Sequence, residues 1–339
     1  MSLLKSIVYN TGLYKLAQPI FGGIGHIITL HRVVETLDDD RIFWSRNLEV
    51  TVEFLEQTIL DFKREEYDII SLEEMYRRLK VGANDKKFVV FTFDDGYEDN
   101  FTLAYPIFKR HKVPFTIYIT KALIEKNLKC WWYDIEDILL CYKKVQAIDI
   151  SLDTSTKELK EAAYLKLRAR IIHTPFENGY AFYRALMAKY PPCKPHAHWK
   201  PMSIEQLKLL AADSLVTIGA HTANHYPLSK LQLAEATLEV VEGKEYLETL
   251  LNKPIVHFSY PYGSANEVGL REMEIVLSSG FVTATTTRIA NIFPEHKDFF
   301  GALPRIPLIE TRREKRLFKM SLSGFLQAYL YKRKRVVTL

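Results

Sequence analysis

The chain has 339 residues, of which 47% are hydrophobic and 26% are charged, and this globular composition excludes a disordered protein. The net charge is +5, yet residues 312–339 contain nine Lys or Arg and one Glu, a local balance of +8 that leaves the remaining chain at −3. Such a basic end is typical of a solvated terminus or of contact with an anionic membrane or glycan, and no groove-reading motif indicates nucleic acid.

The three cysteines form no C-x-x-C pair, so the sequence predicts neither a disulfide framework nor a cysteine zinc site. This pattern suits a reducing compartment. The lead-in segment, residues 1–24, has an apolar run broken by lysines and predicts neither a signal peptide nor a membrane-spanning helix. We therefore expect a cytoplasmic protein, with peripheral contact of the basic tail with the inner membrane face left open.

Strands and helices alternate from Gly25 onward. The apolar run GHIITLH predicts a buried strand, and residues 51–65 have the periodicity of an amphipathic helix. A second helix is predicted in SLEEMYRRLK, where Ser71 and Glu74 have the spacing of a capping box. The next apolar run, KFVVFTF, ends at the turn DDGY and is typical of a strand buried on both faces of a parallel sheet.

The alternation is interrupted once. After the helix LAYPIFKRH and the strand PFTIYIT, the pattern over residues 121–200 is mostly helical and predicts an insertion. The alternation resumes at Ser203 with a capped helix, followed by the strand LVTIGAH, a long helix to Leu251, and the strands IVHFSY and GFVTATTT. Repeated βα units predict a barrel or a doubly wound sheet. We expect one catalytic domain over residues 25–310 and a basic tail over residues 311–339.

Polar clusters follow four of the predicted strands. They are His31, the pair Asp94 and Asp95, His221, and the run Pro261-Tyr262-Gly263. The carboxyl ends of the strands of a parallel barrel share one rim, which is where barrel enzymes place their active sites. The sequence therefore predicts an active site at that rim.

The residue types at this rim suit a metal ion. Two adjacent carboxylates at the end of a buried strand require a compensating cation or several donors, although a D-D-G run alone is more typical of a solvated turn. His221 and His225 are four residues apart, a spacing that allows two imidazoles to bind one ion. Together with Asp95 they would form a three-ligand site with open positions for water and substrate.

The motifs FTFDDGY, GAHTANH and YPYG resemble, in this order, the first three motifs of the polysaccharide deacetylases, the NodB-homology or carbohydrate esterase family 4 enzymes. The resemblance extends from about Gly25 to Pro307. It implies a deformed (β/α) barrel of about seven strands, in agreement with the alternation of strands and helices.

The resemblance also implies a role for each motif residue. Asp94 corresponds to the general base, and Asp95, His221 and His225 correspond to the ligands of one divalent ion, for which zinc is expected. Tyr262 corresponds to the residue whose backbone N–H stabilises the oxyanion. These roles agree with the chemistry of metal-assisted amide hydrolysis.

Two departures from the family pattern concern catalysis. The Arg that begins the third motif and braces the catalytic Asp is replaced by Ser259, and no Leu-x-His motif that would supply the general acid occurs near the C-terminus. Because a barrel has no natural first strand, a circularly permuted order would place the acid, His31, on the opening strand, and Arg305 would brace Asp94. The alternatives are a histidine that caps a strand and a surface ion pair.

We therefore predict a metal-dependent hydrolase that removes the acetyl group of an N-acetylated sugar and releases acetate. The expected compartment favours a lipid-linked or nucleotide-linked precursor of a surface polysaccharide as substrate. Two alternatives are a hydrolase of other small amides and a non-catalytic glycan-binding or membrane-assembly protein that retains the fold.

Overall fold

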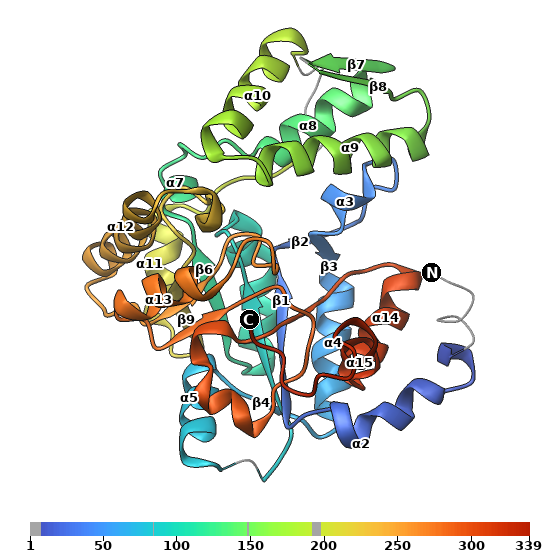
Figure 1. The fold of residues 1–339 in the computed structure, drawn as a ribbon. Helices are drawn as coiled ribbons and strands as arrows, with labels where there is room; N and C mark the ends of the chain where they lie inside the picture. Colours follow the sequence, from blue (N-terminus) through green and yellow to red (C-terminus); the bar gives the residue numbers. More distant parts are fainter. Residues whose placement is uncertain (1–7, 84, 148, 192–197) are drawn as a thin grey trace.

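A curled sheet of parallel strands forms the centre of the computed structural model, which describes residues 8–83, 85–147, 149–191 and 198–339 (Figure 1). Its strand order is β11-β10-β9-β6-β5-β1-β12, and β4 pairs with the start of β5. The strands are β1 (Gly25–Leu30), β4 (Asp68–Ile69), β5 (Phe88–Phe93), β6 (Phe115–Ile119), β9 (Val216–Ala220), β10 (His257–Ser259), β11 (Thr283–Thr285) and β12 (Ile306–Pro307).

Helices surround this sheet, as the alternation of patterns predicted. The main ones are α4 (Val52–Arg64), α5 (Leu72–Val81), α6 (Tyr105–His111), α11 (Ile204–Ala212), α12 (Leu233–Leu251) and α13 (Leu270–Ser278). Short turns of helix are η2 (Asn100–Ala104), α7 (Lys121–Ile124), η3 (Leu228–Lys230), η4 (Pro294–Asp298) and η5 (Phe300–Ala302). The fold is the expected deformed (β/α) barrel.

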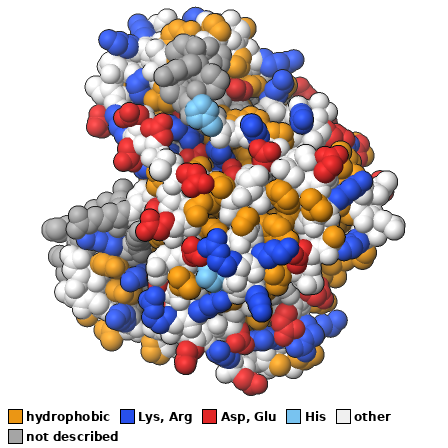
Figure 2. All heavy atoms as spheres, turned by 180° about the vertical axis from the view of Figure 1, so that it is seen from behind, with side chains coloured by type: hydrophobic (Ala, Val, Ile, Leu, Met, Phe, Trp, Pro, Cys, Tyr) orange, Lys and Arg blue, Asp and Glu red, His pale blue; other side chains and the backbone are white. Residues whose placement is uncertain are grey.

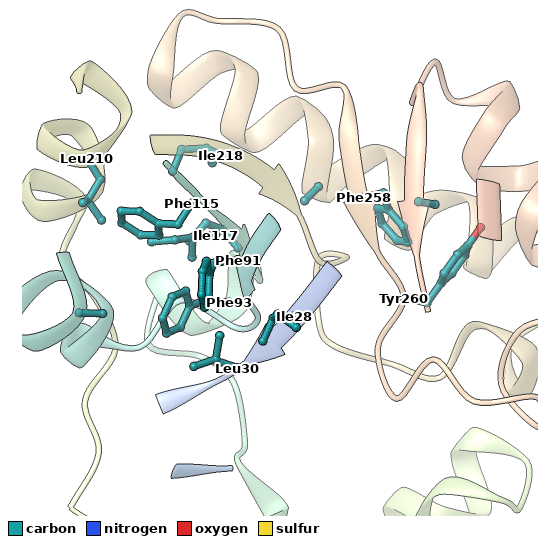
Figure 3. Close-up of a cluster of buried hydrophobic side chains, with 14 of the residues drawn as sticks. Ile28, Leu30, Phe91, Phe93, Phe115, Ile117, Leu210, Ile218, Phe258 and Tyr260 are labelled. Atoms are coloured by element: carbon teal, nitrogen blue, oxygen red, sulfur yellow. The ribbon is translucent and has the colours of Figure 1, made fainter. Parts of the chain in front are cut away.

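The two longest apolar runs form the middle of the sheet. Every residue of β1 and of β5 is buried, as expected for strands covered on both faces. Phe91 and Phe93 of β5 and Phe115 of β6 belong to the main hydrophobic cluster (Figure 3). The cluster also contains Ile28, Leu30 and Leu210. Burial of this apolar surface stabilises the strands at about 25 cal/mol per Å² and fixes the positions of their carboxyl ends.

The predicted helix starts are observed, with one difference. Ser203 and Gln206 form a complete capping box, and Thr51 caps α4. Ser71 also caps α5 through the N–H of Glu74, but the Glu74 carboxylate pairs with Arg77 and Arg78 instead of the cap backbone. The side chain of Glu74 therefore contributes ion pairs on the helix surface rather than the second half of a box.

The strand order places the first strand beside the last one. β1 lies between β5 and β12 and is parallel to both. Leu303, just ahead of β12, pairs in parallel with Thr285 of β11, and so connects the two ends of the sheet. The first strand thus closes the barrel beside the last one, as in any (β/α) barrel, and the permutation relative to the family stays a prediction.

The insertion forms a subdomain that stands above the barrel (Figure 1). It contains α8 (Trp131–Cys141), α9 (Lys157–Ile172) and α10 (Phe176–Lys189), which surround a hydrophobic cluster of their own. An antiparallel hairpin, β7 (Lys144–Ala147) and β8 (Ile150–Asp153), was not expected from the mostly helical pattern. Two short strands, β2 (Arg32–Val34) and β3 (Glu49–Thr51), form a separate parallel pair. The α3 helix (Phe43–Arg46) lies between them in the chain and contacts α8 and α9 of the subdomain.

The cysteines differ from expectation. Cys141 is disulfide-bonded, whereas Cys130 is a buried free thiol. The cytoplasmic localisation stays a prediction.

The two ends of the chain pack together on one side of the barrel. The N-terminal end contains η1 (Leu13–Ala17) and α2 (Gln18–Phe21), and the region expected as a basic tail contains α14 (Arg312–Leu322) and α15 (Phe325–Leu330). The α15 helix contacts both N-terminal elements. None of the helices, within the described ranges, is long and apolar enough to cross a membrane.

Candidate active site

The register of the strands brings the predicted residues to one rim. Leu30 pairs with Phe93, so the residues that follow them, His31 and Asp94, lie at the same level on neighbouring strands. Ala220 pairs with Phe258, which places His221 beside Ser259. The Nδ1 of His221 lies 2.7 Å from the Ser259 carbonyl oxygen and donates to it, and this fixes the ring with Nε2 toward the site.

Asp95, His221 and His225 converge as expected of metal ligands. One ligand atom from each of them lies within 4.8 Å of the others, and all three residues are buried. The Oδ1 of Asp95 is 3.5 Å from Nε2 of His221 and 3.3 Å from Nε2 of His225. Three ligands leave coordination positions open, which is typical of a catalytic rather than a structural metal site.

A carboxylate oxygen that is unpaired within the described part of the chain, Oδ1 of Asp95, indicates that these residues fit a cation. The Oδ1 of Asp95 and the Nδ1 of His225 are buried and have no hydrogen-bond partner among the described residues. A buried carboxylate oxygen without a partner costs roughly 1–3 kcal/mol or more, because it has lost its water. A divalent ion at this position would offset that cost, so the residues present fit the group that the sequence predicted.

The site keeps the Asp95 carboxylate ionised and the His221 imidazole neutral. Burial favours the neutral form of Asp95, but the imidazoles of His225, His31 and His221 outweigh burial, and the pKa of Asp95 lies well below its ordinary value. Burial lowers the pKa of His221 to about 4. An ionised carboxylate and a neutral imidazole are the forms that bind a metal ion.

Asp94 is held by Arg305 at the centre of the barrel. The two guanidinium nitrogens of Arg305 donate to the two carboxylate oxygens of Asp94, each at 2.7 Å, and one of them also donates to the Ser259 hydroxyl at 2.9 Å. Arg305 is fully buried. The contact expected between Arg305 and Asp94 is therefore present, and the Ser259 side chain leaves room for it where the family has its Arg.

The guanidinium determines the charge state of Asp94. Burial alone would raise the pKa of this carboxyl, but Arg305 outweighs burial, with His221 and His31 acting in the same direction, and the pKa lies below its ordinary value. A buried bidentate pair of this kind also fixes the orientation of the carboxylate. Asp94 is thus ionised and oriented at neutral pH.

His31 lies beside Asp94 at the end of β1. Its Nε2 is 3.9 Å from Oδ2 of Asp94, and its side chain is 25% exposed. The ring therefore reaches the site, as expected. The permuted order also predicts that His31 lies opposite Asp94 across the metal site, but the ring is adjacent to Asp94. The backbone carbonyl of His31 accepts a hydrogen bond from Asn100 of η2 at 2.8 Å, a contact that the sequence did not indicate.

The backbone around the site is strained. Asp95, Thr222, His225 and Tyr262 all have positive φ angles, between 60° and 77°. Such conformations cost of order 1–3 kcal/mol each in non-glycine residues and are concentrated at functional sites. For Tyr262, no hydrogen bond of the backbone N–H is found within the described ranges, so this donor is free for a ligand.

Aromatic residues of the insertion form one wall of the site. Trp131 donates from its ring nitrogen to the Tyr262 hydroxyl at 3.1 Å, and the Trp132 ring lies 5.2 Å from that of His225. Both tryptophans are buried, as is Tyr133. An apolar cavity of ≈ 80 Å³ opens next to His225 between these rings and α10. The tryptophans therefore position the metal-site residues and also border a cavity.

Comparison with known proteins agrees with the site. The family model described as polysaccharide deacetylase matches residues 81–275, and the chain therefore belongs to the polysaccharide deacetylase family. Members of this family are hydrolases that act on amide C–N bonds. No curated protein sequence matches the chain significantly.

Several solved structures share the fold. The Streptococcus pyogenes deacetylase PplD in complex with acetate has 18% identity and a TM-score of 0.57, with 87% of this chain and 97% of that chain covered. IcaB from Ammonifex degensii has 16% identity and a TM-score of 0.55, with 88% and 97% covered. A de-N-acetylase from Aggregatibacter actinomycetemcomitans has 13% identity and a TM-score of 0.55, with 87% and 99% covered.

Proposed function

We propose that the protein removes the acetyl group from an N-acetylated sugar of a polysaccharide, or of its lipid- or nucleotide-linked precursor, with one divalent ion, zinc, as cofactor. The observation that carries this proposal is the buried carboxylate of Asp95, which lies between two imidazoles and next to an Arg-held Asp94. The acetate in the PplD structure supports acetate as the product. The family is one of hydrolases, which leaves the non-catalytic alternative without support.

Asp95, His221 and His225 would hold the ion. When bound there, a divalent ion supplies Lewis acidity for the amide carbonyl and for the attacking water. Asp94 is the neighbouring carboxylate that lies outside the ligand cluster and is held by Arg305, and it accepts the proton of the water as the C–O bond forms. Arg305 keeps Asp94 ionised and oriented for this transfer.

The remaining residues act on the oxyanion and the leaving group. The free N–H of Tyr262 donates to the carbonyl oxygen as it becomes negative. His31 then gives a proton to the sugar nitrogen as the C–N bond breaks, so that the products are acetate and a free amine. Its partial exposure allows His31 to be reprotonated from solvent.

Metal content and acetate release test this proposal. Purified protein should contain one equivalent of zinc and release acetate from N-acetylated oligosaccharides. Asp95→Ala and His221→Ala should each lose the metal, because two remaining protein ligands hold an ion weakly. Stoichiometric metal in both variants would refute the site.

Asp94→Asn separates the base from the ligands. It should keep the metal and lose activity by about 10²-fold or more, because a base and not a ligand is removed. His111→Ala is the control, because His111 pairs with Glu56 outside the site. This substitution should change neither the metal content nor the activity. Loss of metal from Asp94→Asn would show that the two aspartates have exchanged roles.

A further inference from the structure

The two chain ends form a surface of unusual composition, which we call the terminal surface. It consists of the apolar residues Leu13, Leu16, Ile20, Tyr329 and Leu330 and the basic residues Lys332, Arg333 and Lys334. Leu16 is 74% exposed and Ile20 is 59% exposed, and the other three apolar residues are about half exposed. A single exposed leucine is ordinary in a soluble protein, but a group of large apolar residues marks an interaction surface.

The apolar residues lie on one helical face. Leu13, Leu16 and Ile20 are spaced at i, i+3 and i+7 along η1 and α2, the spacing of an apolar stripe. In an ordinary amphipathic helix this stripe packs against the core, but here it faces solvent. Tyr329 and Leu330 extend it from α15, which packs on both N-terminal elements.

The charges on these two segments have one sign. Residues 8–24 contain one lysine and no acid, and residues 316–339 contain six Lys or Arg and no acid. By contrast, basic and acidic side chains are interspersed on the face shown in Figure 2. Acidic side chains of neighbouring elements, Glu53, Asp61, Glu65 and Glu310, line the pocket beside η1 and α14, so the excess of positive charge is confined to the two terminal segments. A cluster of positive charge beside an exposed apolar stripe is the signature of a surface that binds anionic lipid.

The basic cluster is presented by a fixed turn. Lys332, Arg333 and Lys334 are exposed, and none of them forms an ion pair within the described ranges, whereas Arg335 pairs with Glu295. The turn is held by hydrogen bonds from the N–H of Arg333 to Ala328 and from that of Lys334 to Tyr331. The positive charges are therefore ordered directly after the exposed end of α15.

A buried amide connects the two ends. The Nδ2 of Asn291 donates to the carbonyl oxygens of Phe21, at 2.7 Å, and of Ser321, at 3.2 Å, so that α2 and α14 are held together. The carbonyl of the buried Val337 is 3.1 Å from the His296 ring. Buried hydrogen bonds thus hold the two segments of the terminal surface together in the folded protein.

We propose that the terminal surface docks the protein onto a membrane of anionic phospholipid, with the apolar residues inserted at the interface and Lys332, Arg333 and Lys334 at the headgroups. Its charge complements that of anionic lipid, and its apolar stripe is that of an interfacial helix. This inference goes beyond the proposed reaction and does not depend on it, although a lipid-linked substrate would be presented at such a surface.

Vesicle sedimentation of the full chain tests the proposal. The protein should bind vesicles of equal parts phosphatidylcholine and phosphatidylglycerol, bind pure phosphatidylcholine much less, and dissociate with added salt. Leu16→Glu/Ile20→Glu should reduce the partition coefficient about tenfold or more. Lys332→Gln/Lys334→Gln should weaken binding and reduce its dependence on salt.

The matched control is Leu238→Glu/Leu270→Glu, which removes two similarly exposed leucines from α12 and α13 and changes the net charge by the same amount. It should bind as the wild type does. The proposal would be overturned if Leu16→Glu/Ile20→Glu bound anionic vesicles as strongly as the wild type, or if the wild type did not bind them. A wild-type dimer that this variant converts to a monomer would also overturn it, because the surface would then serve self-association.

Metal content and turnover of a soluble oligosaccharide should be unchanged in all these variants. A failure of the membrane proposal is thereby separable from a failure of the proposed reaction. Circular dichroism would show that each variant is folded.

Discussion

At the scale of single residues, a guanidinium contact to Asp94 is made from a different sequence position than the family pattern predicts. The position where the family has an Arg is occupied by Ser259, and the guanidinium instead reaches Asp94 from Arg305, at the start of a different strand. Arg305 acts on the reaction only through Asp94, so we regard it as a positioning residue.

Arg305→Lys and Arg305→Met test this role. Removal of one partner of a buried pair costs about 3–5 kcal/mol, so Met should destabilise the protein strongly and Lys less. Because Arg305 holds the pKa of Asp94 down, its loss should raise that pKa, and the acid limb of the pH–rate profile should move to higher pH. The double swap Ser259→Arg/Arg305→Ser should move the acid limb part of the way back toward its wild-type pH. An acid limb that stays in place in folded Arg305→Met, from which the positive charge is lost, would contradict the role.

At the scale of elements, the position of β1 determines which histidine is available as the acid. Because β1 lies between β5 and β12, its last residue is followed by His31 at the level of Asp94. A strand at the edge of the sheet would have placed the ring elsewhere. The assignment of His31 as the acid remains a prediction, which kinetics can check.

His31→Ala should retain the metal and the fold and lose roughly 10² to 10⁴ in turnover, because the leaving amine lacks a proton donor. The alkaline limb of the wild-type pH–rate profile should flatten in the variant. A substrate with a good leaving group, such as an N-acetylated nitroaniline, should be affected much less, since it leaves without a proton. An equal loss on both substrates would contradict the role of a general acid.

Most of the barrel was predictable, because its strands are long apolar runs. The runs GHIITLH and KFVVFTF formed β1 and β5 as predicted, and the ligand set Asp95, His221 and His225 converges as their order along alternating strands implied. Short or exposed elements were not predictable. The β7–β8 hairpin depends on packing within the insertion, and the Cys141 disulfide depends on a spatial proximity that spacing does not encode.

At the scale of the whole molecule, closure of the barrel between β1 and β12 makes the two chain ends neighbours. The junction is buried, and its centre is His26 on β1. The Nδ1 of His26 lies 2.8 Å from Oδ1 of Asn291, whose amide nitrogen holds α2 and α14 together. Since the amide nitrogen donates to carbonyls, Oδ1 must accept from His26, and the imidazole is therefore a donor at this nitrogen.

The buried junction predicts a pH-dependent stability. Burial lowers the pKa of His26 from its ordinary 6.5 to about 3. Between these values the unfolded chain binds a proton that the folded chain does not, so the free energy of unfolding falls as the pH decreases from 6.5 toward 3, by up to about 1.4 kcal/mol per pH unit. Urea unfolding of the metal-free protein across this range measures the slope.

A His26→Gln variant isolates the contribution of His26. His221 and His296, whose pKa values burial also lowers, contribute equally to the wild type and to this variant, so the difference between the two slopes is due to His26. The variant should be less stable at pH 7 but should lose less stability on acidification, and parallel slopes would show that His26 is not the group that titrates.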